Sequence, residues 1–208
     1  MLDHLGDAAG AAPALLGCRL VRTGDGPRRV GVIVETEAYP PDDPACHAYG
    51  GRTARNAAMF GPAGSAYVYR IHRSTCLNVV TGPAGSGQAV LIRAIEPLEG
   101  LDVMRAAREL ATVGNAIPDG TALTNGPGKL CQALDVGLEH DGVPLIRRRA
   151  PRSASASPSA GVLYLMPALD RPDVACSPRI GISRARDAPL RFFVPGNPYV
   201  SGRPRRAS

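Results

Sequence analysis

The sequence predicts one domain that mixes strands and helices. Its 208 residues suffice for one sizeable core, or at most for two small ones. Hydrophobic residues make up 44% of the chain and charged residues 20%, which is the balance of a soluble globular protein. Short segments rich in β-branched and aromatic residues are separated by turns rich in glycine and proline, and two longer segments have helical spacing.

The elements follow from these patterns in order along the chain. A short helix that runs into a strand is expected over residues 11–22. Further strands are expected over residues 30–38, 66–71, 76–80, 89–95 and 162–165. The clearest helix covers residues 97–112, with Pro97 near its start, and a second helix follows the glycine-rich segment 126–134.

The strand over residues 30–38 carries the most informative residues. Side chains alternate across a strand, so Glu35, Glu37 and Tyr39 share one side. A carboxylate beside a tyrosine, with His47 shortly after, could hold a flat substrate and activate a water. Exposed glutamates on the solvent face of a half-buried strand are equally ordinary, and for Glu35 a surface edge near an arginine is the expected place. Taken alone, the pattern leaves both readings open.

Arg93 is the only charged residue in the apolar segment 89–95. A buried, unpaired arginine costs several kcal/mol, so it needs a carboxylate or several acceptors. Glu35 or Glu37 is the expected partner.

A long loop with little periodicity covers residues 40–64. Loops of this length in a compact domain are usually functional or disordered. The presence of His47, Arg52, Arg55 and Asn56 favours a functional loop.

The charge balance favours a polyanionic partner. Lys and Arg number 24 against 18 Asp and Glu, a net charge of +6. Part of this excess lies in the basic, Ser/Ala-rich stretch 147–160, expected to be a mobile surface loop, and in the tail 203–208, expected to be disordered. Lys129 is the only lysine and follows Gly126 at the start of a helix, where backbone N–H groups could hold a phosphate. A simple tight turn is the alternative there.

Other classes are disfavoured. Five widely spaced cysteines, with no CxxC pair, indicate reduced and mostly buried thiols of a cytosolic protein. Neither a signal peptide nor an apolar run of roughly 20 residues is evident, so a membrane protein is not expected. The four histidines show no ligand spacing, and we expect no metal and no cofactor.

Several segments read together as a family pattern. They are Glu35-Thr36-Glu37-Ala38-Tyr39, Asp43 to Ala48, Gly51 to Asn56, Met59-Phe60-Gly61, Tyr67-Val68-Tyr69, Cys76 to Val80, Leu91 to Gly100, Gly126 to Leu134, Pro178 to Ile182 and Leu190 to Pro198. In this order they resemble the alkyladenine (3-methyladenine) DNA glycosylase family, of the single-domain type that lacks a helix-hairpin-helix. The resemblance runs from about residue 12 to residue 202.

This resemblance implies a fold, an activity and a partner. The fold is an α+β single domain with a curved, mainly antiparallel sheet, here spanning residues 11–202 after a flexible N-terminus of residues 1–10. The activity is monofunctional hydrolysis of the bond between a damaged purine and deoxyribose, which starts base excision repair. The partner is double-stranded DNA containing damaged purines, bound by a cytoplasmic, nucleoid-associated monomer.

The resemblance also assigns chemical roles. Glu37 matches the general base that activates the attacking water, Arg93 matches the arginine that holds this carboxylate, and the carbonyl of Ile180 matches a further ligand of the water.

The resemblance also assigns the residues of the base pocket. Tyr39, His47 and Tyr69 match the aromatic residues that sandwich the flipped base. Asn78 matches an amide that disfavours guanine by clashing with its exocyclic amino group.

The expected contacts to DNA come from five residues: His72, Arg73, Arg52, Arg55 and Lys129. His72 takes the place of an aromatic wedge and Arg73 that of a glycine, which is a problem if the backbone there needs a positive φ. We therefore expect weaker flipping or an altered substrate preference.

A second departure concerns the loop between Tyr39 and His47, which is one residue shorter than is usual and carries Pro40-Pro41 in place of a glycine. It could shift His47. Two other functions remain open: a damage-sensing DNA-binding protein without catalysis, and a hydrolase of free nucleosides.

Overall fold

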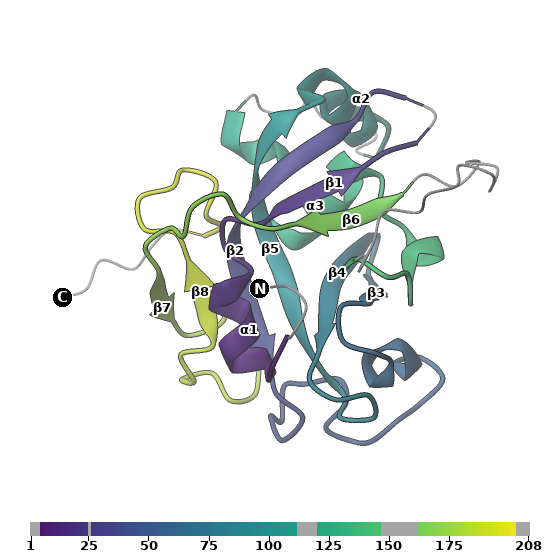
Figure 1. Ribbon diagram of the computed structural model, residues 1–208, viewed down its shortest axis with the longest axis vertical. Coiled ribbons are helices and arrows are strands. Elements are labelled where there is room, and N and C mark those ends of the chain that lie inside the picture. The colour runs from purple at the N-terminus through teal and green to yellow at the C-terminus, as the bar shows by residue number, and fades with distance from the viewer. Residues whose placement is uncertain (1–4, 25, 112–119, 147–161, 203–208) are drawn as a thin grey trace.

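The two longest strands, β2 (Arg29–Tyr39) and β5 (Gln88–Glu99), form the centre of the sheet. The computed structural model describes residues 5–24, 26–111, 120–146 and 162–202 (Figure 1). The basic stretch 147–160 and the tail 203–208, on which the sequence analysis commented, lie outside these residues.

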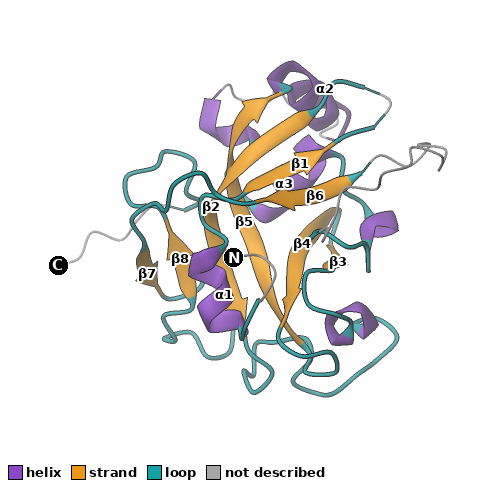
Figure 2. Cartoon of the chain, in the orientation of Figure 1, coloured by secondary structure: helices purple, strands orange, loops and turns teal. Residues whose placement is uncertain are grey.

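Every strand pairing in the described chain is antiparallel. The strand order is β3-β4-β5-β2-β1-β6, and a further pair, β7-β8, joins the sheet through β2. The shorter strands are β1 (Arg19–Arg22), β3 (Ala66–Ile71), β4 (Ser74–Thr81), β6 (Leu163–Met166), β7 (Ala175–Ser177) and β8 (Arg191–Phe193). The sheet curls, and helices and loops surround it (Figure 2). The predicted α+β fold with a curved antiparallel sheet is confirmed.

The helices are α1 (Ala8–Ala14), α2 (Leu101–Ala111) and α3 (Pro127–Leu134), and short 3₁₀ turns cover Ala57–Phe60, Gly120–Leu123 and Leu138–His140. Helix α1 contacts β2, β5 and β8, whereas α3 contacts β4 and β5 and carries α2 on its outer side. None of the helices in the described part of the chain has the length and apolarity that a bilayer crossing requires.

The sheet has one face in the main core and one face in the site. On β3, β4 and β5, Val68, Leu77, Val79 and Ile92 belong to the main core together with residues of α1 and α3. The residues between them on these strands point to the opposite face, where the loop 40–64 covers the sheet. The period of two in each strand therefore separates the residues of the main core from those that line the cavity.

Two element boundaries differ from the prediction. The helix predicted from residue 97 begins at Leu101, because β5 continues through Glu99 and Gly100 turns the chain with φ 77°. Pro97 lies in the strand opposite Gly31, beside a register shift. A proline is tolerated at such an irregularity because no regular ladder hydrogen bond is lost. The helix pattern beyond Ala111 lies outside the described residues.

The N-terminal segment is also more ordered than predicted. Asp7 caps α1 by accepting a hydrogen bond from the N–H of Gly10 at 2.7 Å, and Leu5 is buried in the main core. The prediction of a flexible N-terminus is thus wrong for residues 5–10, because a side-chain cap and one apolar anchor suffice to attach the helix.

Close packing at the centre of the sheet generates a stability prediction. A Cβ atom added at Gly31 lies 2.6 Å from Cδ1 of the fully buried Ile95. We expect Gly31→Ala to lower the free energy of unfolding by about 1–3 kcal/mol, the usual cost of overpacking, as measured by urea denaturation. Gly50→Ala is the matched control, since an added Cβ there meets nothing within 4 Å. Wild-type stability of Gly31→Ala would contradict the packing described.

Candidate active site

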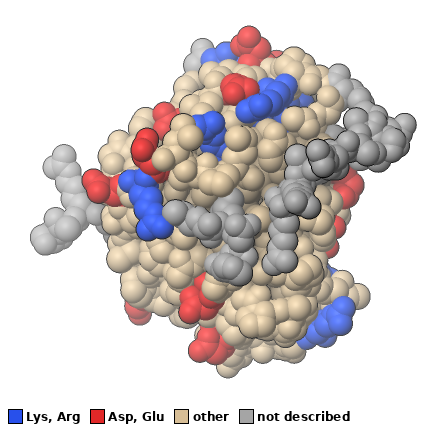
Figure 3. All heavy atoms as spheres, in the orientation of Figure 1, with Lys and Arg blue, Asp and Glu red and all other residues tan. Residues whose placement is uncertain are grey.

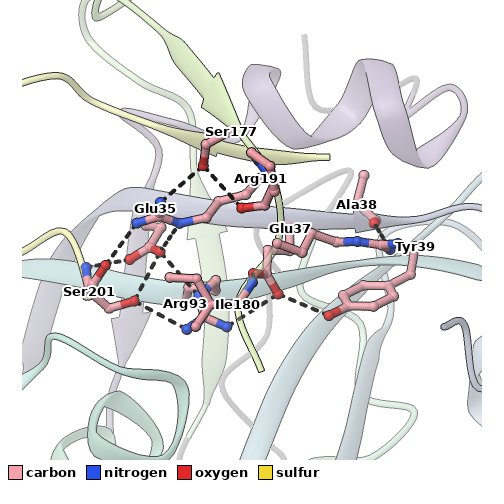
Figure 4. Close-up of polar contacts among 11 residues, drawn as sticks. Glu35, Glu37, Ala38, Tyr39, Arg93, Ser177, Ile180, Arg191 and Ser201 are labelled. Carbon is pink, nitrogen blue, oxygen red and sulfur yellow. Dashed lines mark hydrogen bonds and ion pairs between the residues drawn. The ribbon is translucent and has the colours of Figure 1, made fainter. Parts of the chain in front are cut away.

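The carboxylate of Glu37 lies at the centre of the site and is fully buried. Its Oε2 accepts hydrogen bonds from the hydroxyl of Tyr39 at 2.9 Å and from Nη1 of Arg93 at 3.2 Å. Its Oε1 accepts one from the backbone N–H of Ile180 at 2.8 Å (Figure 4). Donors on both oxygens fix the orientation of the carboxylate.

Local strand geometry explains how Arg93 reaches two carboxylates. Glu35 and Glu37 are two residues apart on β2 and face the same side. On β5, Ala94 pairs with Glu35 and Ile92 with Thr36, so Arg93 is an extra residue at a register shift. Such a bulge re-aims a side chain. Both expected partners are thus confirmed as contacts of Arg93, at 3.1 Å for Glu35 and 3.2 Å for Glu37.

Glu35 is not at a surface edge, and that prediction is wrong. Its side chain is fully buried and accepts hydrogen bonds from Nε of Arg191 at 2.6 Å and from the N–H and hydroxyl of Ser201 at 2.6 and 2.9 Å. Arg191 and Ser201 come from β8 and the segment after it, far along the chain. This distance explains why no local pattern indicated the burial of Glu35.

A cavity of about 330 Å³ opens beside this charged cluster. Its wall includes all five residues predicted for the base pocket and Arg93: Tyr39, His47, Tyr69, Asn78, Arg93 and Ile180. Glu37 lies directly behind the part of the wall formed by its partners Tyr39, Arg93 and Ile180. The volume lies in the range of small-molecule sites and suits a flat aromatic guest.

Three aromatic rings form one side of the cavity. The rings of His47 and Tyr69 meet edge to face, with centroids 4.5 Å apart, and Tyr67 lies 5.5 Å from Tyr69. The hydroxyl of Tyr67 lies 2.9 Å from Nδ1 of His47. Burial and then the charge of Arg55 lower the pKa of His47, so the neutral ring is favoured and can accept this hydrogen bond. His47 thus reaches the cavity despite the short preceding loop.

Sequence reasoning did not select Tyr67 as a site residue. Its position two residues before Tyr69 on β3 placed both rings on one face, and that was the available signal. The backbone carbonyl of Tyr67 also accepts a hydrogen bond from the Asn78 amide at 3.0 Å, which fixes the orientation of this amide in the cavity wall.

Arg179 supports the outer side of the pocket and was also missed. Its guanidinium lies 4.7 Å from the ring centroid of Tyr39, forms an ion pair with Asp43 and donates to the carbonyl of Ala38 at 2.9 Å. Both ion-pair partners are buried. Arg179 thus joins the segment before Ile180 to the end of β2.

None of the five residues predicted to contact DNA lines the cavity. His72 and Arg73 form the exposed two-residue turn between β3 and β4, next to Ile71 in the cavity wall. Arg52 and Arg55 are exposed on the loop 40–64, and Arg55 donates to the carbonyl of Arg70 at 3.4 Å. The face of the molecule in Figure 3 shows scattered charges of both signs rather than a single basic patch.

The hairpin turn shows which of its two residues has the positive φ that favours glycine. The residue with positive φ is His72, at 51°, and Arg73 is not among the described residues with positive φ. This is the φ pattern of a type II′ turn, in which only the first central residue needs the left-handed region. The expected conflict at Arg73 is therefore absent, and the strained position is His72.

Lys129 is already engaged within the protein. Its Nζ donates to Oδ1 of Asn125 at 2.7 Å, and burial together with nearby Arg108 lowers its pKa. Pro127, at the start of the same helix α3, lines the cavity, whereas Lys129 is not among the lining residues.

In the part of the chain that the structure describes, no three His, Cys, Asp or Glu side chains come together to form a metal site. The cysteines are buried except for Cys176. Burial raises the pKa of the Cys131 thiol to about 12, as expected for an inert buried thiol.

The fold and the site together define an enzyme-like pocket with aromatic walls, next to a buried carboxylate. Residues 3–198 match the family description "Methylpurine-DNA glycosylase". The chain belongs to this family, which makes it a DNA glycosylase of DNA repair.

Individual relatives cover nearly the whole chain. A protein of Rhodopseudomonas palustris named "Putative 3-methyladenine DNA glycosylase" is 47% identical over 91% of this chain and 83% of its own length. Proteins with the same name from Methanoculleus marisnigri and Nitrosospira multiformis are each 44% identical, over 95% and 96% of this chain and 95% and 92% of their own lengths.

The lowered pKa of His47 can be tested by substitution. We expect Arg55→Gln to raise the pKa of His47, because the repulsion between the guanidinium and a protonated ring is removed. An NMR titration of the imidazole resonances measures this shift. Arg52→Gln is the matched control, since Arg52 is not a cause of the shift. An unchanged His47 titration in Arg55→Gln would refute the electrostatic contribution of Arg55.

Proposed function

We propose that this glycosylase excises alkylated and deaminated purines of the 3-methyladenine type from double-stranded DNA, with Glu37 as the general base. The observation that carries the proposal is the position of the Glu37 carboxylate, held between Arg93, Tyr39 and Ile180 at the wall of an aromatic cavity.

The buried base first has to leave the duplex. A nucleotide is rotated out of the stack at a cost of a few kcal/mol, which is least for damaged or mispaired bases. The cavity then receives the base between Tyr39 on one side and His47 and Tyr69 on the other. Alkylated purines carry positive charge, and the electron-rich faces of tyrosine attract such a ring by about 0.5–2 kcal/mol.

Hydrolysis follows from the charges of the site. A cationic base is a good leaving group, and the sugar develops oxocarbenium character as the N-glycosidic bond breaks. The carboxylate of Glu37 takes a proton from the attacking water and offsets this developing positive charge. Arg93 and the N–H of Ile180 orient the carboxylate, and we assign to the carbonyl of Ile180 a hydrogen bond from the water.

Selection against normal guanine is assigned to Asn78. Its amide is held by the carbonyl of Tyr67 and lies in the cavity wall, where it opposes an exocyclic amino group on the purine. Selection therefore acts on the edge of the base, whereas the aromatic rings act on its faces.

DNA contacts are assigned to the exposed side chains around the cavity mouth. Arg73, Arg52 and Arg55 are exposed, and we assign them to contacts with DNA phosphates, which would make binding depend on salt concentration. His72 at the hairpin tip is assigned to the space that the flipped nucleotide leaves. Lys129 contacts the DNA backbone only if its hydrogen bond to Asn125 is replaced by one to a phosphate.

The role of Glu37 generates the central prediction. We expect Glu37→Gln to slow base release about 10³-fold, because a neutral amide cannot take the proton from water. Single-turnover release of free base from a duplex with one hypoxanthine or one 7-methylguanine measures this effect. Glu109→Gln, on the exposed side of α2, is the matched control.

The same assay separates the alternatives. Retained release in Glu37→Gln would exclude Glu37 as the general base. A wild-type protein that binds the lesion duplex without releasing base would be a damage sensor. Activity on free nucleosides that is indifferent to DNA and to salt would indicate a nucleoside hydrolase.

The wedge role of His72 is tested at the hairpin turn. We expect His72→Ala to weaken lesion-duplex binding and slow base release by about 10-fold, because stacking on an aromatic ring contributes roughly 1–3 kcal/mol per base. His72→Gly separates this effect from backbone strain, since glycine accepts the φ of 51° but has no ring. Binding and release that stay unchanged in both variants would reject the wedge role.

A further inference from the structure

Arg93 has all three guanidinium nitrogens engaged, each with a different partner. Nε donates to Oε1 of Glu35 at 3.1 Å, Nη1 to Oε2 of Glu37 at 3.2 Å, and Nη2 to the hydroxyl of Ser201 at 3.2 Å. A planar guanidinium with three fixed acceptors has one orientation. The partners of Nε and Nη2 therefore determine which edge of the guanidinium Arg93 presents to Glu37.

The other two positions belong to one connected cluster (Figure 4). The Ser201 hydroxyl bridges Arg93 and Glu35, since it also donates to Oε1 of Glu35 at 2.9 Å. Glu35 receives a second ion pair from Arg191, at 2.6 Å, and Arg191 donates to the carbonyl of Ser201 at 2.8 Å. The N–H of Ser201 completes the cluster with a bond to Oε2 of Glu35 at 2.6 Å.

The charges of this cluster balance only when all members are present. Glu35 and Glu37 are fully buried, and Arg93 and Arg191 are 8% and 7% exposed. Two carboxylates and two guanidiniums leave no net charge, so each ion is compensated. Arg191 compensates Glu35, and this leaves the charge of Arg93 available to Glu37.

We propose that Glu35, Arg191 and Ser201 are positioning residues that hold Arg93 so that it orients the carboxylate of Glu37. The proposal rests on the proposed role of Glu37 as general base. Glu35 itself accepts four hydrogen bonds on its two oxygens, and of its partners only Arg93 lines the cavity, so it does not act as a second base. Ser201 lies beyond residue 198, where the family match ends, so the segment after β8 supplies part of the catalytic arrangement.

Ser201 offers the cleanest test, because one hydroxyl can be removed with little other change. Ser201→Ala removes the bonds to Glu35 and Arg93 but keeps the backbone N–H and carbonyl contacts. We expect about 10-fold slower single-turnover base release, since hydrogen bonds to charged groups are strong and Arg93 loses one fixed acceptor. Ser201→Thr keeps a hydroxyl and is expected to release base within about threefold of the wild-type rate.

Two measurements separate positioning from general stability. Lesion-duplex Kd is expected to stay at the wild-type value in Ser201→Ala, and release is measured well below the melting temperature of each variant, so that only the chemical step changes. In a double-mutant cycle, adding Ser201→Ala to Glu35→Gln is expected to slow base release little further than Glu35→Gln alone, because both substitutions act through Arg93. If Glu35→Gln fails to fold, the comparison of Ser201→Ala with Ser201→Thr still tests the proposal.

The proposal is overturned if Ser201→Ala releases base within twofold of the wild-type rate. It is also overturned if Ser201→Thr is as slow as Ser201→Ala although both are fully folded at the assay temperature, or if the slower release in Ser201→Ala is explained by its unfolded fraction at that temperature. A fast Glu37→Gln enzyme would instead refute the proposed function, whatever the Ser201 variants do.

Discussion

The buried arrangement of Glu35, Arg93 and Glu37 is the interaction on which the site depends. Buried ions are tolerated only when they are paired and hydrogen-bonded, and removing one member leaves an uncompensated charge. Here the arginine comes from β5 and both carboxylates come from β2, so the same contacts join the central strand pair of the sheet and hold the proposed general base. The register of β2 against β5, with its bulges, is thus a condition for the geometry of the site as well as for the fold.

This dependence extends to distant parts of the chain. Arg191 and Ser201 reach Glu35 from β8 and beyond, and Ile180 and Arg179 reach Glu37 and Tyr39 from the segment after β7. The part of the described chain from β7 onward packs Leu190, Phe192 and Val194 against the main core and surrounds the two glutamates. The site therefore requires this part to be folded against the sheet.

Much of the fold was predictable from the sequence because its signals are local. Alternating β-branched segments indicated β2 to β5, and the need of Arg93 for a carboxylate correctly indicated Glu35 and Glu37. The start of α2 was mispredicted because Pro97 is typical of a first helical turn, and only its pairing with Gly31 shows that it lies within a strand. The burial of Glu35 depends on contacts with residues more than 150 positions away. The base pocket was predicted through resemblance to a family, whereas Tyr67 and Arg179 became evident only from their neighbours in space.

The interleaving of core and cavity residues on β3, β4 and β5 restricts how this protein can evolve. A one-residue insertion or deletion in any of these strands exchanges the two faces, so that Tyr69 or Asn78 enters the core and Val68 or Leu77 enters the cavity. New lesion preferences can therefore arise by replacing residues in place, or by changing the length of the loop 40–64, which covers the cavity without belonging to the sheet. The length of this loop can therefore change without exchanging the two faces of the sheet, whereas the length of a strand cannot.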